Sequence, residues 1–203
     1  MRLWRIPFST NVERVALALG HKRLTADWVD IDPSDRSDVE RLSGQPLVPV
    51  LELDGRVIAD STAIIEELER LQREPPLYPR EPARRAEVEI FVDWFNRVWK
   101  RPPSELEAEL SKLESDRETT ERLGAEIAAA LGRFESLLDG RDYLFGDFGV
   151  ADCIAFPFLK YAVLYDPGDD ELFHRILVEH QRLDGRYPRL ERWIHRSNAR
   201  PRS

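Results

Sequence analysis

The sequence predicts two domains, an α/β domain with a mixed sheet followed by an all-helical domain. Short apolar runs alternate with amphipathic segments through the first 74 residues, a pattern typical of strands and helices that share one core. Four prolines then fall within residues 73–82, and no strand signal follows them. We therefore expect the α/β domain over residues 1–74, a linker over 75–82 and the helical domain over 83–203.

The first domain opens with a strand and a helix. An apolar run at 3–6 predicts the strand, and a proline follows it. Thr10 and Glu13 then match the S/T-x-x-E capping box, so a helix is expected from Thr10, with Gly20 near its end.

Turn and helix-cap residues indicate the order of the remaining strands and helices in this domain. Asp54-Gly55 indicates a tight hairpin between two strands, and Asp60-Ser61 suits the start of a helix. The expected order is β-α-β-α-β-β-α, which implies a mixed sheet with helices on both faces. The other strands are expected at 26–31, 48–53 and 56–59, with a short helix or loop at 33–42.

The second domain shows only helical signals. A wide apolar face predicts a helix over 83–100, and Arg101-Pro102-Pro103 is expected to end it. Residues 104–138 are helical in composition, and three more helices are expected at 150–164, 171–182 and 188–196. The apolar face of the helix over 83–100 comprises Val88, Phe91, Val92, Phe95, Val98 and Trp99.

Composition and charge exclude several classes of protein. The formal net charge is −8, and no Lys/Arg cluster is flanked by aromatic residues, so nucleic acid is not an expected partner. The short basic stretch 196–202 is expected to be solvated. No apolar run approaches the roughly 20 residues that span a bilayer, and the start of the chain lacks the pattern of a signal peptide. A membrane is therefore not an expected partner either.

Cysteine and histidine usage limits the chemistry further. Cys153 is the single cysteine, so an intrachain disulfide is impossible and a reducing, cytoplasmic compartment is expected. The four histidines and Cys153 show no paired metal-ligand spacing. This spacing argues against a structural zinc site. No cofactor is expected either.

Three motifs of the first domain resemble those of a known family. They are residues 7–15, in which Ser9 stands just before a helix and about five residues ahead of an Arg-Val pair, residues 43–51, which contain Val48-Pro49, and residues 60–65, which begin with Asp60-Ser61. Their order and spacing resemble the soluble glutathione transferases, in particular serine-type members with a glutaredoxin-like first domain. The resemblance covers nearly the whole chain. It implies a thioredoxin-like domain that binds glutathione, followed by an all-α domain.

The resemblance gives Ser9 the catalytic role. The first turn of a helix presents unpaired N–H groups and the positive end of the helix dipole, which favour a nearby anion. A hydroxyl placed there can donate to a thiolate and lower the pKa of the thiol, whose ordinary value is about 8.5. Thr10 and Asn11 are the alternative donors. The competing interpretation is that Ser9 or Thr10 only caps the helix.

The second motif resembles the cis-proline loop of this fold. The Val48–Pro49 peptide is therefore expected to be cis, and the Val48 backbone would pair with the cysteinyl part of glutathione. The position two before Pro49 is often Lys or Gln in the family and helps to hold a glutathione carboxylate. Here that position is Leu47, and Gln45 is the nearest substitute. The competing interpretation is an edge-strand proline without a ligand.

The third motif resembles the helix start that holds the γ-glutamyl group. The Ser61 hydroxyl and N–H would bind its carboxylate at the helix N-terminus, and Asp60 would accept from its ammonium group. Both residues are also good N-caps, so the motif alone is weak evidence.

Two features of the second domain complete the comparison. Residues 145–152 resemble the folding motif of the family, with Gly149 as N-cap and Asp152 returning a hydrogen bond to the Gly149 N–H. We interpret this motif as structural and Cys153 as a buried small apolar residue. The candidates for an electrophile pocket are Trp94, Trp99, Tyr161 and Tyr165, although most aromatics at helical spacing belong to a core.

The resemblance thus implies a glutathione-dependent transferase that activates the thiol for attack on a small hydrophobic electrophile, as in detoxification. Family members are usually homodimers, and a homodimer is expected here. Two alternatives stay open: a non-catalytic regulatory or binding protein that reuses this fold, and a transferase for another low-molecular-weight thiol. A glutaredoxin-type reductase is not expected, because Ser9 and Val12 stand where such a motif has its two cysteines.

Overall fold

The computed structural model describes residues 1–203 and divides into two compact units. The first unit comprises Met1–Arg80 together with Arg200–Ser203, and the second comprises Glu81–Ala199. All strands lie in the first unit, and the second is built from helices. The predicted fold class, a βαβαββα domain followed by an all-helical domain, is confirmed. The last four residues, which we expected in the helical domain, lie instead with the first unit.

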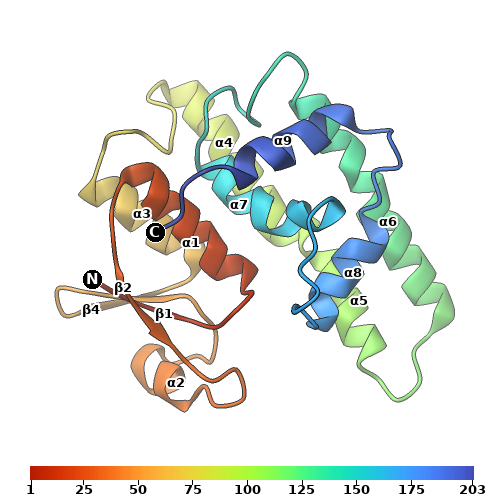
Figure 1. Cartoon of the computed structure of the whole chain (residues 1–203), viewed down its shortest axis with the longest axis horizontal. Helices are drawn as coiled ribbons and strands as arrows, with labels where there is room; N and C mark the ends of the chain where they lie inside the picture. The colour runs from red at the N-terminus through yellow and green to blue at the C-terminus, as the bar shows by residue number, and fades with distance from the viewer. The chain divides into compact units, whose positions relative to one another are not determined.

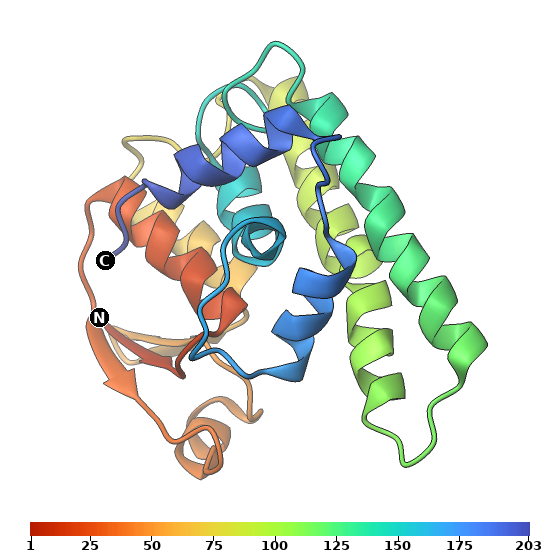
Figure 2. The same ribbon diagram turned by 45° about the vertical axis from the view of Figure 1, so that its right-hand side comes forward.

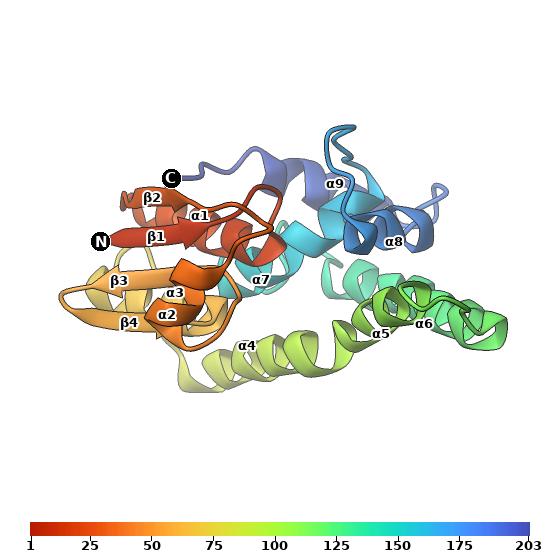
Figure 3. The ribbon, with the colours of Figure 1, turned by 90° about the horizontal axis from the view of Figure 1, so that it is seen from below.

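The sheet of the first unit has the strand order β2-β1-β3-β4. β1 and β2 are parallel and the other two pairings are antiparallel, so the sheet is mixed, as predicted (Figure 3). β3 begins at Val50 rather than at Val48, because its register with β1 ends at the pair Trp4–Val50. The strand bounds are Arg2–Arg5 (β1), Asp27–Asp30 (β2), Val50–Leu53 (β3) and Arg56–Ala59 (β4).

The hairpin between β3 and β4 is the one that the sequence predicts. Asp54 and Gly55 connect the strands with φ angles of 49° and 75°. A two-residue hairpin turn of this kind needs two left-handed residues, which explains the Asp-Gly pair.

Three helices cover the sheet: α1 (Thr10–Lys22), α2 (Ser37–Ser43) and α3 (Ser61–Leu71). α1 and α3 pack together on one face, and α2 lies on the other (Figure 1). α2 begins later than the predicted 33–42, because a turn precedes it in which Asp32 Oδ1 accepts the Ser34 N–H at 2.8 Å. This local hydrogen bond offers the backbone an alternative to the helix.

The second unit contains six α-helices, and α5 and α6 lie side by side (Figure 2). None of the helices in the chain combines the length and the apolarity needed to cross a membrane. The bounds are α4 Pro82–Trp94, α5 Arg101–Leu110, α6 Arg117–Leu137, α7 Val150–Leu159, α8 Leu172–His180 and α9 Pro188–Asn198, with a π-helical turn at Phe95–Trp99 and a 3₁₀ turn at Lys160–Ala162.

The helical stretch expected over 83–100 is α4 with its π-helical turn, and it ends at Trp99, ahead of the two prolines as predicted. Pro102 and Pro103 also lie in the first turn of α5, since the first helical positions need no backbone N–H donor. Val98, expected on the buried face, is 47% exposed. The π-helical turn explains the difference: the Lys100 N–H donates to the Phe95 carbonyl at 3.0 Å, and this wider turn shifts the faces of the helix.

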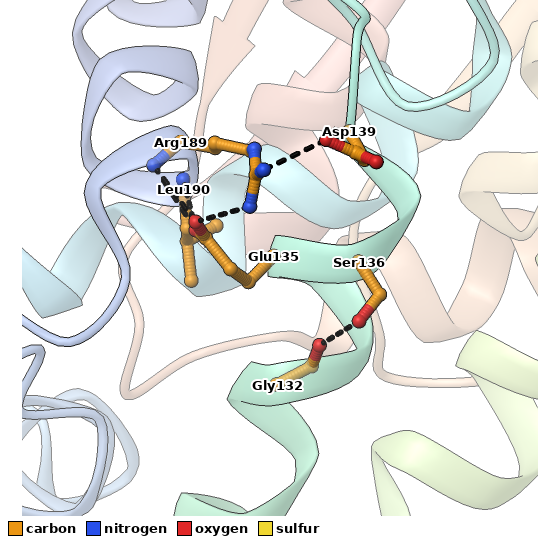
Figure 4. A network of polar contacts seen from close by, with 6 residues as sticks. All are labelled: Gly132, Glu135, Ser136, Asp139, Arg189 and Leu190. Atoms are coloured by element: carbon orange, nitrogen blue, oxygen red, sulfur yellow. Dashed lines mark hydrogen bonds and ion pairs between the residues drawn. The ribbon is translucent and has the colours of Figure 1, made fainter.

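A carboxylate of α6 caps the start of α9 (Figure 4). Tyr187, at the N-cap position of α9, provides no side-chain cap. Glu135 instead accepts the N–H groups of Arg189 and Leu190 at 3.0 and 2.9 Å, and the Arg189 guanidinium also reaches Asp139 at 2.7 Å. The helix-start donors are thus satisfied by a neighbouring helix.

The capping box predicted ahead of α7, with Gly149 as N-cap, is confirmed. Asp152 accepts from the N–H of Gly149 at 3.0 Å, from the N–H of Leu144 at 3.1 Å and from Trp193 Nε1 at 2.7 Å. Burial raises the pKa of the Asp152 carboxyl to about 6. Cys153 is fully buried, as expected.

Candidate functional site

The ends of three loops of the first unit, those that precede α1, β3 and α3, meet around one small apolar cluster. The cluster contains Val12 of α1, Val48 and Val50, with Ala59 packed against it. Val12 lies in the first turn of α1, Val48 belongs to the cis-proline loop, and Ala59 directly precedes α3 and its cap. The packing therefore brings the three motifs into one region of the unit.

Ser9 is the N-cap of α1. Its Oγ accepts the Val12 N–H at 3.3 Å. The prediction that Thr10 caps this helix is wrong: Thr10 is the first helical residue and is buried. With Ser9 as N-cap, Glu13 stands at the fourth helical position instead of the third, and its carboxylate pairs with Arg202.

Capping does not exhaust the hydrogen-bonding capacity of Ser9. A hydroxyl has one donor and two acceptor positions. The bond from Val12 uses an acceptor position, so the O–H hydrogen of this half-buried side chain can still be donated. Capping and donation to an anion are therefore compatible at Ser9.

The backbone is strained at two of the three loop ends. Phe8, next to Ser9, has a φ of 59°, and Asp60, before α3, has a φ of 84°. Positive φ is rare for residues other than glycine, and least expected for a bulky aromatic. Such strain persists where the surrounding structure over-determines it, often at functional sites.

The Val48–Pro49 peptide is cis, as the second motif predicts. Val48 lies beyond the β1–β3 ladder, which ends at Val50. The Gln45 side chain braces this loop: its Nε2 donates to the Leu47 carbonyl, and its Oε1 accepts the Leu47 N–H, both at 2.9 Å. The Leu47 side chain is 62% exposed.

Asp60 and Ser61 begin α3. Asp60 Oδ1 accepts the N–H groups of Thr62 and Ala63 at 2.8 and 3.1 Å, which leaves Oδ2 for another donor. Ser61 is buried, and its Oγ accepts from Arg14 Nη1 at 3.3 Å. The first motif contains Arg14, but no local sequence signal predicts this long-range partner.

The four aromatics proposed for an electrophile pocket form two groups in the second unit. Trp94 and Trp99 line a cavity of about 230 Å³ next to Arg133. Tyr161 and Tyr165 meet at Asp169: the Tyr161 hydroxyl donates to its carboxylate at 2.8 Å, and the Tyr165 hydroxyl donates to its carbonyl at 3.0 Å. The buried Tyr161 hydroxyl is therefore engaged within the protein.

The basic stretch 196–202, expected to be solvated, makes specific contacts. Arg200 Nη2 donates to His21 Nδ1 at 2.9 Å, and Arg202 pairs with Glu13. No sequence signal links these pairs, which are separated by more than 170 residues. No group of three or more His, Cys, Asp or Glu side chains is arranged to hold a metal ion.

Comparison with known proteins shows that both units match domain models of one protein family. Residues 3–76 match the model of the glutathione S-transferase N-terminal domain, and residues 117–196 match that of the C-terminal domain. FtsZ-localized protein A of Caulobacter vibrioides is 32% identical over 157 residues, covering 71% of this chain and 68% of that protein. Glutathione S-transferase GstB of Escherichia coli is 26% identical over 209 residues, covering 98% and 93%.

A solved structure agrees with these matches. The glutathione S-transferase of Methylobacillus flagellatus, with GSH bound, superposes with a TM-score of 0.80 at 20% identity and covers 98% of this chain and 95% of its own. The fold, the two domain matches and the match to GstB agree. The chain belongs to the glutathione S-transferase family.

Proposed function

We propose that the first unit binds glutathione and that the Ser9 hydroxyl stabilises its thiolate. The observation that carries the proposal is the meeting of three loop ends around the Val12–Val48–Ala59 cluster, with a hydroxyl at the start of α1. A hydroxyl there acts together with the α1 dipole, and both favour the ionised form of a thiol. The Methylobacillus flagellatus glutathione S-transferase, solved with GSH bound, supports this ligand.

The remaining contacts follow from the chemistry of the loop ends. The Val48 backbone, outside the sheet ladder, would pair with the cysteinyl residue of the tripeptide, with cis-Pro49 shaping the loop. Asp60 Oδ2 would accept from the γ-glutamyl ammonium, and the Ser61 hydroxyl would donate to the γ-glutamyl carboxylate. Gln45 would contribute as the brace of the same loop.

The reaction would be attack of the thiolate sulfur on a small hydrophobic electrophile. Catalysis would come from ionisation of the thiol and from holding both molecules together, without a covalent enzyme intermediate. Trp94 and Trp99, and less directly Tyr161 and Tyr165, are the side chains proposed to contact the electrophile. A reducing cytoplasm that contains glutathione is the proposed compartment, and a homodimer is the proposed assembly, checked by sedimentation velocity.

The test compares binding with conjugation in Ser9→Ala. Loss of a donor to a developing anion costs about 10²-fold or more in kcat, whereas the glutathione Kd should change little. Ser136→Ala in the second unit removes a hydroxyl that donates to the Gly132 carbonyl and serves as the control. Conjugation at the wild-type rate in Ser9→Ala would remove Ser9 as the activator.

The second candidate is a non-catalytic protein that binds a polymer or another partner through this fold. The match to FtsZ-localized protein A favours it, since that relative shares 32% identity while GstB shares 26%. Co-sedimentation with FtsZ polymers, together with failure to be retained on immobilised glutathione, would support this candidate against the transferase. Thermal-shift measurements with other low-molecular-weight thiols test the remaining alternative.

A further inference from the structure

The segment Arg200–Ser203 follows α9 in the chain and lies along α1 of the first unit (Figures 1 and 2). The Ser203 N–H donates to the Ala16 carbonyl at 3.3 Å. Gly20 lies against Pro201 so closely that a Cβ at Gly20 would overlap the Pro201 carbonyl. The missing side chain at Gly20 therefore lets the segment rest on the helix.

Arg202 of this segment holds Glu13. The Nε and Nη2 atoms of Arg202 donate to Glu13 Oε1 at 3.0 and 2.8 Å. The Arg202 and Glu13 side chains are only 30% and 15% exposed. The attraction is therefore screened less by water and salt than in a fully exposed pair.

Glu13 lies one helical turn beyond Ser9. Its N–H donates to the Ser9 carbonyl at 3.0 Å, and residues four apart share one face of a helix. A carboxylate at this place counteracts the positive end of the helix dipole and disfavours a second anion beside Ser9. The Arg202 guanidinium offsets that negative charge.

We propose that Arg202 is a positioning residue for the thiolate: its pair with Glu13 keeps the leading end of α1 favourable to an anion. The segment Arg200–Ser203 is the strap that brings it there. This inference rests on the proposed function, because it requires a thiol bound at Ser9. The thiol proton leaves to solvent, and Arg202 neither accepts nor donates it.

The test is the pH profile of kcat/KM, combined with titration of the bound thiol by its ultraviolet thiolate absorbance. Arg202→Gln should raise the apparent pKa of the bound thiol and lower kcat/KM about threefold at a pH below that pKa, with convergence above it. Glu13→Gln should shift the pKa in the opposite direction. The double variant should restore the wild-type profile, because neither charge remains.

Arg70→Gln is the matched control. It removes an arginine whose partner, Glu67, lies in the same unit at the far end of α3, and it should leave the profile unchanged. A lowered melting temperature in Arg202→Gln with an unshifted thiol pKa would overturn the inference and leave the strap a purely structural role. A wild-type protein that binds no glutathione would overturn the proposed function and this inference together.

Discussion

The buried Arg14 guanidinium donates to the Ser61 hydroxyl at 3.3 Å and joins α1 to the first residue of α3. Arginine has no acceptor, so Ser61 Oγ must accept in this bond. The Ser61 hydrogen is not used in this bond and can be donated to an acceptor other than Arg14. The pair therefore presents the Ser61 hydroxyl as a donor at the place proposed for the γ-glutamyl carboxylate.

Ser61→Ala should weaken both stability and binding. It removes an acceptor from a buried, charged donor, so the free energy of unfolding should fall by about 1–3 kcal/mol. Glutathione affinity should fall about tenfold through the lost charge-assisted bond. Urea unfolding and titration calorimetry measure the two effects. Wild-type affinity in Ser61→Ala would contradict the proposed carboxylate contact.

The order of strands and helices could be predicted because each element carries its own local signal. The alternation of apolar runs, the Asp54-Gly55 turn and the helix start at Asp60 all depend on nearby residues. The cap of α1 could not be decided in this way, since Ser9 and Thr10 are both good N-caps. The packing that buries Thr10 belongs to the tertiary structure.

The long-range contacts of Arg14 and Arg202 could not be predicted for the same reason. Arg14 with Ser61 and Arg202 with Glu13 are separated by 47 and 189 residues. The neighbouring residues in the sequence look the same whether a charged side chain forms a long-range pair or faces solvent. The two cases can be told apart only in the folded unit.

Gly20→Ala should displace the segment Arg200–Ser203. The new methyl group overlaps the Pro201 carbonyl, so the cost of overpacking, about 1–3 kcal/mol, should exceed the gain in helix propensity. Gly132→Ala is the matched control, because a Cβ there meets no atom within 4 Å, and it should stabilise the protein by about 0.5–1 kcal/mol. Thermal unfolding and hydrogen exchange at Ser203 report the two results. Equal stabilisation by both substitutions would show that the segment does not rest on Gly20.

The strap should loosen as the pH falls. His21 Nε2 lies 3.1 Å from the Pro76 carbonyl and Nδ1 accepts from Arg200, so the ring is neutral with its proton on Nε2. Burial lowers the pKa of His21 below 6.5, and the charges of Arg200 and Lys22 lower it further, against the opposing effects of the Pro76 hydrogen bond and of Glu69. A second ring proton would face the Arg200 donor.

The sign of this effect follows from proton linkage. The unfolded chain binds more protons than the folded one in the range just below pH 6.5, the ordinary value for His21. The stabilisation is therefore complete above that pH and is lost as the pH falls through the lowered pKa. Hydrogen exchange of the segment, corrected for the intrinsic rate, should accelerate on acidification in the wild type and in the exposed control His195→Gln. A His21 imidazole that titrates at or above its ordinary value in NMR would contradict this account.

Asp152→Asn should destabilise the second unit at neutral pH even though it removes a buried charge. Both oxygens of Asp152 accept N–H donors, from Leu144 and Trp193 at Oδ1 and from Gly149 at Oδ2. An amide supplies one acceptor atom only, so an NH₂ group must face one of these donors. The unpaired donor should cost about 1–3 kcal/mol in the free energy of unfolding.

The pH dependence separates this explanation from simple loss of packing. Because burial raises the pKa of Asp152 from 3.8 to about 6, the folded protein binds more protons than the unfolded chain in that range, and the contribution of this carboxyl to stability falls as the pH rises through it. Asp152→Asn should abolish that part of the pH dependence, whereas Asp147→Asn, an exposed change in the preceding loop, should retain it. Urea unfolding across this range measures both. Equal stability of Asp152→Asn and the wild type at pH 7 would mean that the carboxyl is protonated there and that one of its oxygens is already a donor.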